Sequence, residues 1–389
     1  MIAPELRFPQ FTDPWREGHA GDAFSNSKAK GKAGLPIWSV TLDRGMVPRS
    51  SLDLKLEADA SDEKNLRAQP GDLVYNMMRM WQGAVGQATE DCMVSPAYVV
   101  LRPKRGTSPA FFDHWFKAPY MLHRLRAYSH GLTKDRLRLY YADFAKIPIK
   151  IPAPQEQARI ADFMSAVTKK TDLLRREMAI FTALRHGVVQ KLFSHSLSFK
   201  RTKNDAFPDW DVQALGDLFH PRVETSVDGL PIYSVSQANG MVPRSSLDRD
   251  FGGSADTTGY KRAAAGDLVY NTMRMWQGAV AMAPVDCSVS PAYVVLRPAE
   301  NTVAEFFLHW FKEPQMKHRL WAQSYGLTDD RLRLYYKDFA NIRVRVPHPD
   351  EQRKIADSLS AIDAKIDAVS AQIALMETFK RGLLQKMFV

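Results

Sequence analysis

Cysteine is scarce in this sequence, which has two among 389 residues. A small secreted scaffold depends on a network of disulfides, so the composition favours a protein of the reducing cytosol. The sequence also has no basic segment followed by an apolar core near its start, and no run of about 18 apolar residues that could cross a membrane. We therefore expect a cytoplasmic protein that does not span a membrane.

Catalytic signatures are missing as well. The sequence contains no GxGxxG or GxxxxGKS/T string, no HExxH, no CxxC and no Asp/Asn-Pro-Pro-Tyr/Phe string for adenine methylation. Asp53 and Lys55 resemble the end of a nuclease motif, but the equivalent region further along the chain has Asp248 and Asp250. We predict that this chain holds no catalytic residue, no metal and no cofactor of its own.

Acidic residues are too few to balance the basic ones. There are 53 Lys and Arg against 43 Asp and Glu, which gives a net charge of +10 and a pI near 9.4. The apolar content of 45% is normal for a packed chain, so the excess charge does not reflect wholesale disorder. A polyanionic partner is indicated, with nucleic acid as the first candidate.

The chain consists of one unit written twice, at an offset of 195 residues. GDLVYNMMRMWQGAV begins at Gly71 and GDLVYNTMRMWQGAV at Gly266, while VSPAYVVLRP begins at both Val94 and Val289. The alignment needs no gap from Trp15 to the end. A period of this length indicates two domain-sized modules rather than a solenoid, and we expect a pseudo-two-fold arrangement.

Each copy has a mixed part and a helical part. PIWSV, DLVYN and AYVVL are short strand-like runs bounded by Gly and Pro, and Ser108-Pro109 can open a helix, so residues 1–152 and 196–347 are predicted to form α+β (α/β-like) domains. Residues 153–195 and 348–389 carry an apolar residue every 3.5 positions and are predicted to form an antiparallel coiled coil. The predicted seam comprises Ile160, Met164, Val167, Leu174, Met178, Phe181, Val188 and Leu192 in the first helix, and Ile355, Leu359, Ile362, Ile366, Val369, Ile373, Met376, Leu383 and Met387 in the second.

Two polar segments in each copy are candidates for DNA contact. The end of the DLVYN run and the loop after it carry Asn, Arg and Gln, which can form paired hydrogen bonds with adenine or guanine edges. The segment GLTKDRLRLYY carries cations suited to phosphates, and an arginine in RSS is a third candidate. The candidates are Arg49, Asn76, Arg79, Gln82, Lys134, Arg136 and Arg138, with Arg244, Asn271, Arg274, Gln277, Arg331 and Arg333 in the second copy. The alternatives are a salt-bridged arginine beside a packed Met/Trp cluster and a merely solvated strand.

The order of motifs resembles the specificity subunit of type I restriction–modification enzymes. IPIKIPAPQEQARIADFMSAV at 147–167 and IRVRVPHPDEQRKIADSLSAID at 342–363 are similar to the strand, proline pair and Glu-Gln-x-x-Ile helix start that end that family's recognition domains. HGVVQKLF at 186–193, RGLLQKMF at 381–388, and both copies of GDLVYN and GMVPR also fit. In that family the two recognition domains are often unrelated, whereas here they are near-copies.

The resemblance implies a non-catalytic subunit that reads double-stranded DNA. It implies two modification subunits as partners, which use S-adenosylmethionine to methylate adenine, and restriction subunits that can join them. The long helices would separate the recognition domains and dock the modification subunits. A nuclease fused to a recognition module and a coiled-coil scaffold that binds proteins remain as alternatives.

The near-identity of the copies predicts a palindromic or near-palindromic target with an unread spacer. Equal side chains on equivalent backbones should prefer equal bases. Asymmetry is expected from Thr41-Leu42-Asp43-Arg44, which is Ser236-Gln237-Ala238-Asn239 in the second copy, and from Met77 against Thr272.

Overall fold

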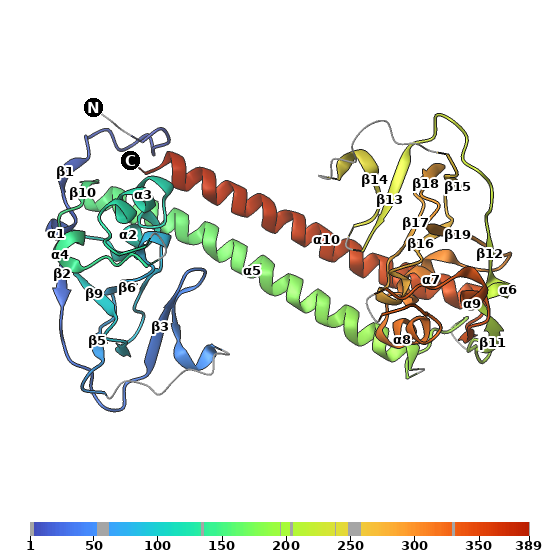
Figure 1. Ribbon diagram of the computed structural model, residues 1–389. Coiled ribbons are helices and arrows are strands. Elements are labelled where there is room, and N and C mark those ends of the chain that lie inside the picture. Colours follow the sequence, from blue (N-terminus) through green and yellow to red (C-terminus); the bar gives the residue numbers. More distant parts are fainter. Residues whose placement is uncertain are drawn as a thin grey trace. The chain divides into compact units, whose positions relative to one another are not determined.

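The computed structural model describes residues 4–52, 62–133, 136–194, 196–202, 205–237, 239–247, 258–328 and 331–388. The chain forms two compact units (Figure 1): unit 1 comprises Met1–Met178 and Val369–Val389, and unit 2 comprises Ala179–Ala368. Both ends of the chain thus belong to unit 1. The bounds predicted for the recognition domains, 1–152 and 196–347, remain predictions.

Unit 1 contains two four-stranded sheets and a two-stranded ribbon. The first sheet has the order β2-β9-β6-β7 and the second β4-β3-β8-β5, while β1 pairs with β10. The strands are β1 (Arg16–His19), β2 (Phe24–Ser27), β3 (Ile37–Thr41), β4 (Gly45–Pro48), β5 (Leu66–Ala68), β6 (Leu73–Asn76), β7 (Val85–Gln87), β8 (Cys92–Val94), β9 (Tyr98–Pro103) and β10 (Pro148–Ile151). The short helices are α1 (Ala20–Ala23), α2 (Pro109–Trp115), α3 (Pro119–Ala127) and α4 (Tyr141–Phe144), with 3-10 turns at Arg49–Ser51 and Met80–Gln82.

The first sheet of unit 1 is covered on both faces. Along β6, Leu73 and Tyr75 pack into the core shared with the helices, whereas Val74 between them packs against the second sheet. This follows from the two-residue alternation of side chains along a strand. The pairs are antiparallel apart from β3 with β8. The predicted α+β class is confirmed.

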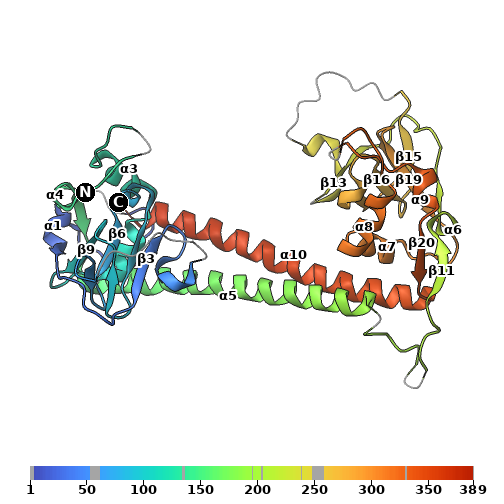
Figure 2. The same ribbon diagram turned by 60° about the horizontal axis from the view of Figure 1, so that its bottom comes forward.

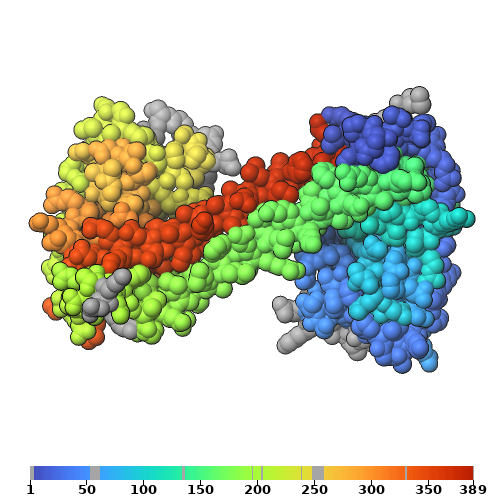
Figure 3. Space-filling view, turned by 180° about the vertical axis from the view of Figure 1, so that it is seen from behind, coloured from blue at the N-terminus to red at the C-terminus, as the bar shows by residue number. Residues whose placement is uncertain are grey.

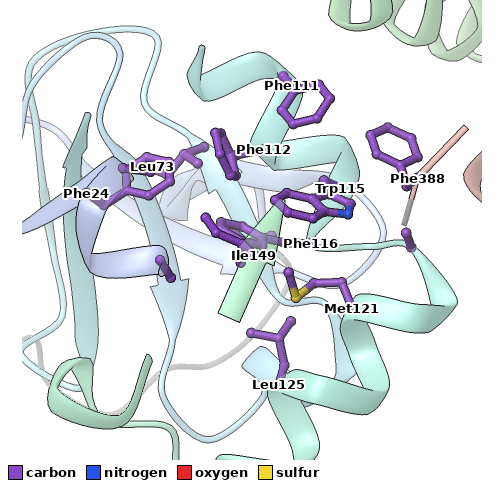
Figure 4. Close-up of a cluster of buried hydrophobic side chains, with 14 of the residues drawn as sticks. Phe24, Leu73, Phe111, Phe112, Trp115, Phe116, Met121, Leu125, Ile149 and Phe388 are labelled. Carbon is purple, nitrogen blue, oxygen red and sulfur yellow. The ribbon is translucent and has the colours of Figure 1, made fainter. Parts of the chain in front are cut away.

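The helix-side core of unit 1 is built from aromatic rings. Ser108 caps α2 by accepting a hydrogen bond from the Phe111 amide, and Pro109 occupies the first helical position, as the sequence predicts. Phe111 and Trp115 are fully buried. Phe388, near the end of the chain, enters the same core, with its ring centroid 5.5 Å from that of Phe111 (Figure 4).

Unit 2 repeats this arrangement. Its sheets have the orders β12-β19-β16-β17 and β14-β13-β18-β15, and β11 pairs with β20. The strands are β11 (Asp211–Ala214), β12 (Phe219–Pro221), β13 (Ile232–Ser236), β14 (Gly240–Pro243), β15 (Lys261–Ala263), β16 (Leu268–Asn271), β17 (Val280–Met282), β18 (Cys287–Val289), β19 (Tyr293–Pro298) and β20 (Arg343–Val346). The short helices are α6 (Leu215–Leu218), α7 (Ala304–Trp310), α8 (Pro314–Ala322) and α9 (Tyr336–Ala340), with 3-10 turns at Arg244–Ser246 and Met275–Gln277.

The two predicted long helices are α5 (Pro154–Phe193) and α10 (Pro349–Lys386). Each unit contains a segment of both, and the two segments lie side by side (Figures 1 and 2). In unit 1, Ile160 of α5 shares a core with Leu383 of α10, while Arg175 forms an ion pair of 2.8 Å with Glu377. The segments are therefore antiparallel. Predicted seam positions are buried or half-buried throughout, which confirms the coiled coil.

The Glu-Gln pair at the start of α5 joins this helix to the rest of unit 1. The buried Gln157 side chain donates to the Gly106 and Pro152 carbonyls, at 3.1 and 2.8 Å, and accepts from the Ser108 amide at 2.8 Å. Glu156 is held by Arg7 at 2.7 Å. In unit 2, Gln352 makes the equivalent bonds to Pro347 and Val303. The Glu-Gln pair at the start of each long helix therefore provides hydrogen-bond partners for buried polar groups near that helix start.

The two cysteines and His114 are buried groups with structural roles. Cys92 and Cys287 are free buried thiols, and burial raises the pKa of Cys287 to about 11. Burial lowers the pKa of His114 to about 4. No cluster of metal-ligand side chains and no helix long and apolar enough to cross a membrane occurs within the described ranges. Asp53, Lys55, Asp248 and Asp250 lie outside the described residues.

Candidate nucleic-acid interface

The first predicted segment of unit 1 is a tight turn at the end of β6. The Arg79 amide bonds to the Asn76 carbonyl at 3.0 Å, and the Ala84 amide bonds to the Arg79 carbonyl at 3.1 Å. Gly83 has φ of 91°, a left-handed conformation that favours glycine. The Asn76 side-chain oxygen accepts the Met78 amide at 2.9 Å. Asn76 thus stabilises the turn, and Arg79 and Gln82 are exposed on it. We call residues 76–83 the turn loop of unit 1.

The second predicted segment lies against the turn loop. We call residues 130–140 the basic segment of unit 1; positions 134 and 135 within it, including the candidate Lys134, are outside the described residues. His130 and Arg138 exchange backbone hydrogen bonds of 2.9 and 2.8 Å, and the Leu139 amide bonds to the Met77 carbonyl at 2.9 Å. A Cβ on Gly131 would lie 2.3 Å from the Arg136 carbonyl oxygen, so the narrow crossing requires glycine.

The turn loop and the basic segment line one cavity of about 890 Å³. The lining residues are Leu42, Met78, Arg79, Gln82, His130, Gly131, Leu132, Arg136, Arg138 and Tyr140. The structure therefore brings Arg79 and Gln82 together with Arg136 and Arg138, which follow them by more than fifty residues in the sequence. Among the described residues, no carboxylate lies within ion-pair distance of Arg79, Arg136 or Arg138. Uncompensated arginines around a concave surface create a positive potential that suits an anion.

Unit 2 has the equivalent turn loop at 271–278 and a basic segment at 325–335, within which positions 329 and 330 are outside the described residues. The Leu334 amide bonds to the Thr272 carbonyl at 2.9 Å, and Tyr325 exchanges backbone bonds with Arg333. The Asn271 side-chain oxygen accepts the Met273 amide at 3.0 Å. The predicted cations Arg274, Arg331 and Arg333 are exposed, and Gln277 is half-buried.

The third predicted position does not join these segments. Arg49 lies in the 3-10 turn after β4 and is not among the residues that line the cavity. Its equivalent Arg244 donates a hydrogen bond to the Tyr260 hydroxyl. Both arginines are half-buried.

Sequence reasoning missed Met78, His130 and Leu132 in the cavity lining. For Leu132 the sequence offered only the GLT string that both copies repeat, whereas its exposure is known from the structure. Leu132 and its equivalent Leu327 are almost fully exposed, at 103% and 99%, and each occurs in a GLT string of the repeat. An apolar residue that is exposed in both copies is more informative than a single exposed one.

Comparison with known proteins connects this surface to a family. The family model for the type I restriction modification DNA specificity domain matches residues 17–179 and 208–377. The chain belongs to this family. One relative is the type I restriction enzyme MjaX specificity subunit of Methanocaldococcus jannaschii. It is 18% identical to this chain over 372 residues, which cover 91% of this chain and 86% of the relative. The crystal structure of the S subunit of a type I restriction–modification system from M. genitalium shares the fold with a TM-score of 0.64 at 16% identity, covering 100% of this chain and 99% of the other.

The family match confirms the family resemblance and the function predicted from the sequence. Specificity subunits of type I restriction–modification systems are non-catalytic subunits that recognise DNA and assemble with methyltransferase and restriction subunits. Two matched domains in one chain fit recognition of a bipartite target. The alternatives, a nuclease fusion and a protein-binding scaffold, are not supported.

Proposed function

We propose that each unit of this specificity subunit reads one half of its DNA target with the turn loop and the basic segment. The observation that carries this proposal is the convergence of Arg79, Gln82, Arg136 and Arg138 on one cavity of unit 1. The equivalent segments of unit 2 have the same backbone connections. Two copies of one constellation suit a target with two related halves.

The side chains divide into two roles. Arg79 and Gln82, with Arg274 and Gln277, contact base edges, because a guanidinium matches guanine O6 and N7 and an amide matches adenine N6 and N7. Arg136 and Arg138, with Arg331 and Arg333, contact phosphates, which position the protein without selecting a base. Lys134, Arg49 and Arg244 add cationic contacts to the phosphates of the DNA backbone. Asn76 and Asn271 hold the turn loops in shape, since their side-chain oxygens are bonded there.

The target is a palindrome or near-palindrome with an unread spacer. Support comes from the near-identity of the turn loops. Within GDLVYNxMRMWQGAV they differ at one position, which is Met77 in unit 1 and Thr272 in unit 2. Adenine methylation belongs to two modification subunits, which bind S-adenosylmethionine and receive the flipped base. The free thiols of Cys92 and Cys287 support a cytoplasmic location for the complex.

The long helices provide docking surfaces for the modification subunits. Figure 3 shows α5 in green and α10 in red with one side uncovered. In unit 2, Ile180 and Leu184 of α5 are 67% and 48% exposed, and in unit 1 their equivalents Leu375 and Phe379 of α10 are 69% and 48% exposed. Exposed apolar pairs one helical turn apart are suited to a partner helix. Two equivalent pairs suit two copies of one partner.

Replacing Ile180 and Leu184 by Ser is expected to release one methyltransferase subunit, and replacing Leu375 and Phe379 by Ser the other. Each buried apolar side chain contributes about 1.5–3 kcal/mol, so a double change weakens one site by roughly two to four orders of magnitude. Native mass spectrometry measures the number of bound subunits. Val223→Ser, which removes an exposed apolar residue away from the helices, is the control. Retention of two subunits by both double variants would contradict the docking surfaces.

The proposed function is tested by mapping methylated adenines in a host without other adenine methylation. The chain expressed with its methyltransferase subunits is expected to direct methylation to a bipartite motif of two related halves. Neither component alone should do so, because the chain carries no methylation motif. Two unrelated half-sites, or methyl transfer from S-adenosylmethionine by the purified chain, would contradict the proposal.

A further inference from the structure

The two recognition surfaces differ at few positions. Of the ten residues that line the cavity of unit 1, eight have identical equivalents in unit 2 at the offset of 195 residues. The exceptions are Leu42, which corresponds to Gln237, and His130, which corresponds to Tyr325. Any difference in base preference that arises from this lining must come from these two positions.

The side chains of His130 and Tyr325 have equivalent acidic neighbours in the two units. The His130 Nε2 atom lies 3.7 Å from the Asp143 carboxylate, and the corresponding Asp338 is an electrostatic neighbour of the Tyr325 hydroxyl. Their backbones also make the same ladder bonds, to Arg138 and Arg333 respectively. Position 130 thus has the same backbone connection and the same acidic neighbour as position 325, although the rings differ.

The residues Leu42 and Gln237 occupy the tip of the hairpin that joins β3 to β4 and β13 to β14. An equivalent hydrogen bond spans the hairpin in both units, since Thr41 Oγ1 accepts the Arg44 amide at 3.1 Å and Ser236 Oγ accepts the Asn239 amide at 3.2 Å. Leu42 is 42% exposed and lines the cavity.

Gln237 is also exposed, and it contacts the turn loop of unit 2. Its side-chain Nε2 donates to the Gln277 carbonyl at 3.0 Å. The hairpin tip thus lies beside the turn loop in each unit.

The other asymmetric candidates from the sequence are directed elsewhere. Met77 is partly buried against the helix-side core of unit 1, and the hydroxyl of its equivalent Thr272 donates to the Ala292 carbonyl at 3.0 Å. Arg44 lies 3.7 Å from the Asp43 carboxylate, and neither residue is among those that line the cavity. Among the hairpin and turn-loop positions that differ between the units, position 42 is therefore the one that combines a change in chemistry with a place at the cavity.

We infer that the hairpin-tip residue, Leu42 in unit 1 and Gln237 in unit 2, determines specificity and makes the two half-sites differ at one base pair. Leucine offers only apolar contact, which suits the thymine methyl group, whereas glutamine donates and accepts hydrogen bonds and suits adenine. This inference rests on the proposed function, since it assumes that the turn loops contact base edges.

The test exchanges the two residues in the full chain, expressed with its methyltransferase subunits, and maps methylated adenines. The wild-type motif is expected to have two halves that match except at one position. Leu42→Gln should convert it to a palindrome of the unit 2 half, and Gln237→Leu to a palindrome of the unit 1 half. The preference at that base should change about 5- to 150-fold. Arg44→Asn, which copies the residue of unit 2 in the same hairpin but does not line the cavity, is the matched control that should leave the motif unchanged, and His130→Tyr tests the other lining position that differs between the units.

The outcomes separate this inference from the proposed function. A bipartite wild-type motif that Leu42→Gln leaves unaltered, or that His130→Tyr or Arg44→Asn alters instead, would overturn the inference alone. A fully palindromic wild-type motif would also overturn it, because Leu42 and Gln237 would then select the same base. A wild-type complex without a bipartite motif would overturn the proposed function itself. Normal complex assembly in native mass spectrometry shows that each variant is folded.

Discussion

Arg79→Ala is expected to relax base discrimination in one half-site, and Arg274→Ala in the other. A bidentate contact to a base contributes roughly 1–3 kcal/mol, so each change should reduce the preference for the correct base about 5- to 150-fold. Both side chains are exposed on turn loops without a carboxylate partner among the described residues, so their loss leaves no buried charge behind. Competition binding of the assembled complex to DNA with single-base changes, at one fixed salt concentration, measures the effect.

Two controls distinguish base contact from simple attraction to DNA. Arg136→Ala and Arg331→Ala should weaken binding to all sequences alike and reduce the slope of log K against log salt by about 0.9 per lost phosphate contact. Arg79→Lys keeps the charge but removes the planar fork, so discrimination should fall while the salt slope is retained. Equal losses for specific and random DNA in every variant would contradict the division of roles.

Phe388→Ala is expected to destabilise unit 1 by about 3–5 kcal/mol, although the residue is one position from the end of the chain. Its side chain is 3% exposed and packs against Phe111 in the aromatic core of unit 1 (Figure 4). Truncation leaves a cavity that the surrounding rings cannot fill. Hydrogen exchange of the isolated chain measures the effect, since amides of α2 in unit 1 should exchange faster while those of α7 in unit 2 do not.

The controls for this prediction come from the same helix and from the second copy. Phe379→Ala changes a residue of α10 that is 48% exposed, so it should cost little. Phe193→Ala removes the equivalent ring in unit 2, which stacks on Trp310 at 5.6 Å, and should accelerate exchange in α7 rather than α2. Equal acceleration of α2 and α7 in both variants, or an equal effect of Phe379→Ala, would show that the ends of the long helices do not belong to separate cores.

Some of the candidate site could be predicted because its chemistry is local. Arg79 and Gln82 follow a strand and precede a glycine with positive φ, so the sequence already indicates an exposed polar turn. The role of Asn76 was not predictable in the same way. Its residue type suits adenine, but only the hydrogen bond of its side-chain oxygen to the Met78 amide shows that the turn uses it.

The strands β3, β6 and β9 with their equivalents in unit 2, the capped start of α2, the long helices and the twofold repeat were determined by the sequence alone. Strand-like runs, capping residues, the 3.5-residue period and identity at a fixed offset are properties of neighbouring or directly comparable residues. The tertiary structure decided which distant segments meet. It placed the basic segment against the turn loop through the bond from the Leu139 amide to the Met77 carbonyl, put Leu42 at the cavity while Met77 packs against the core, and brought Phe388 to Phe111. These contacts depend on chain crossings and core packing between residues far apart in sequence, which no local pattern encodes.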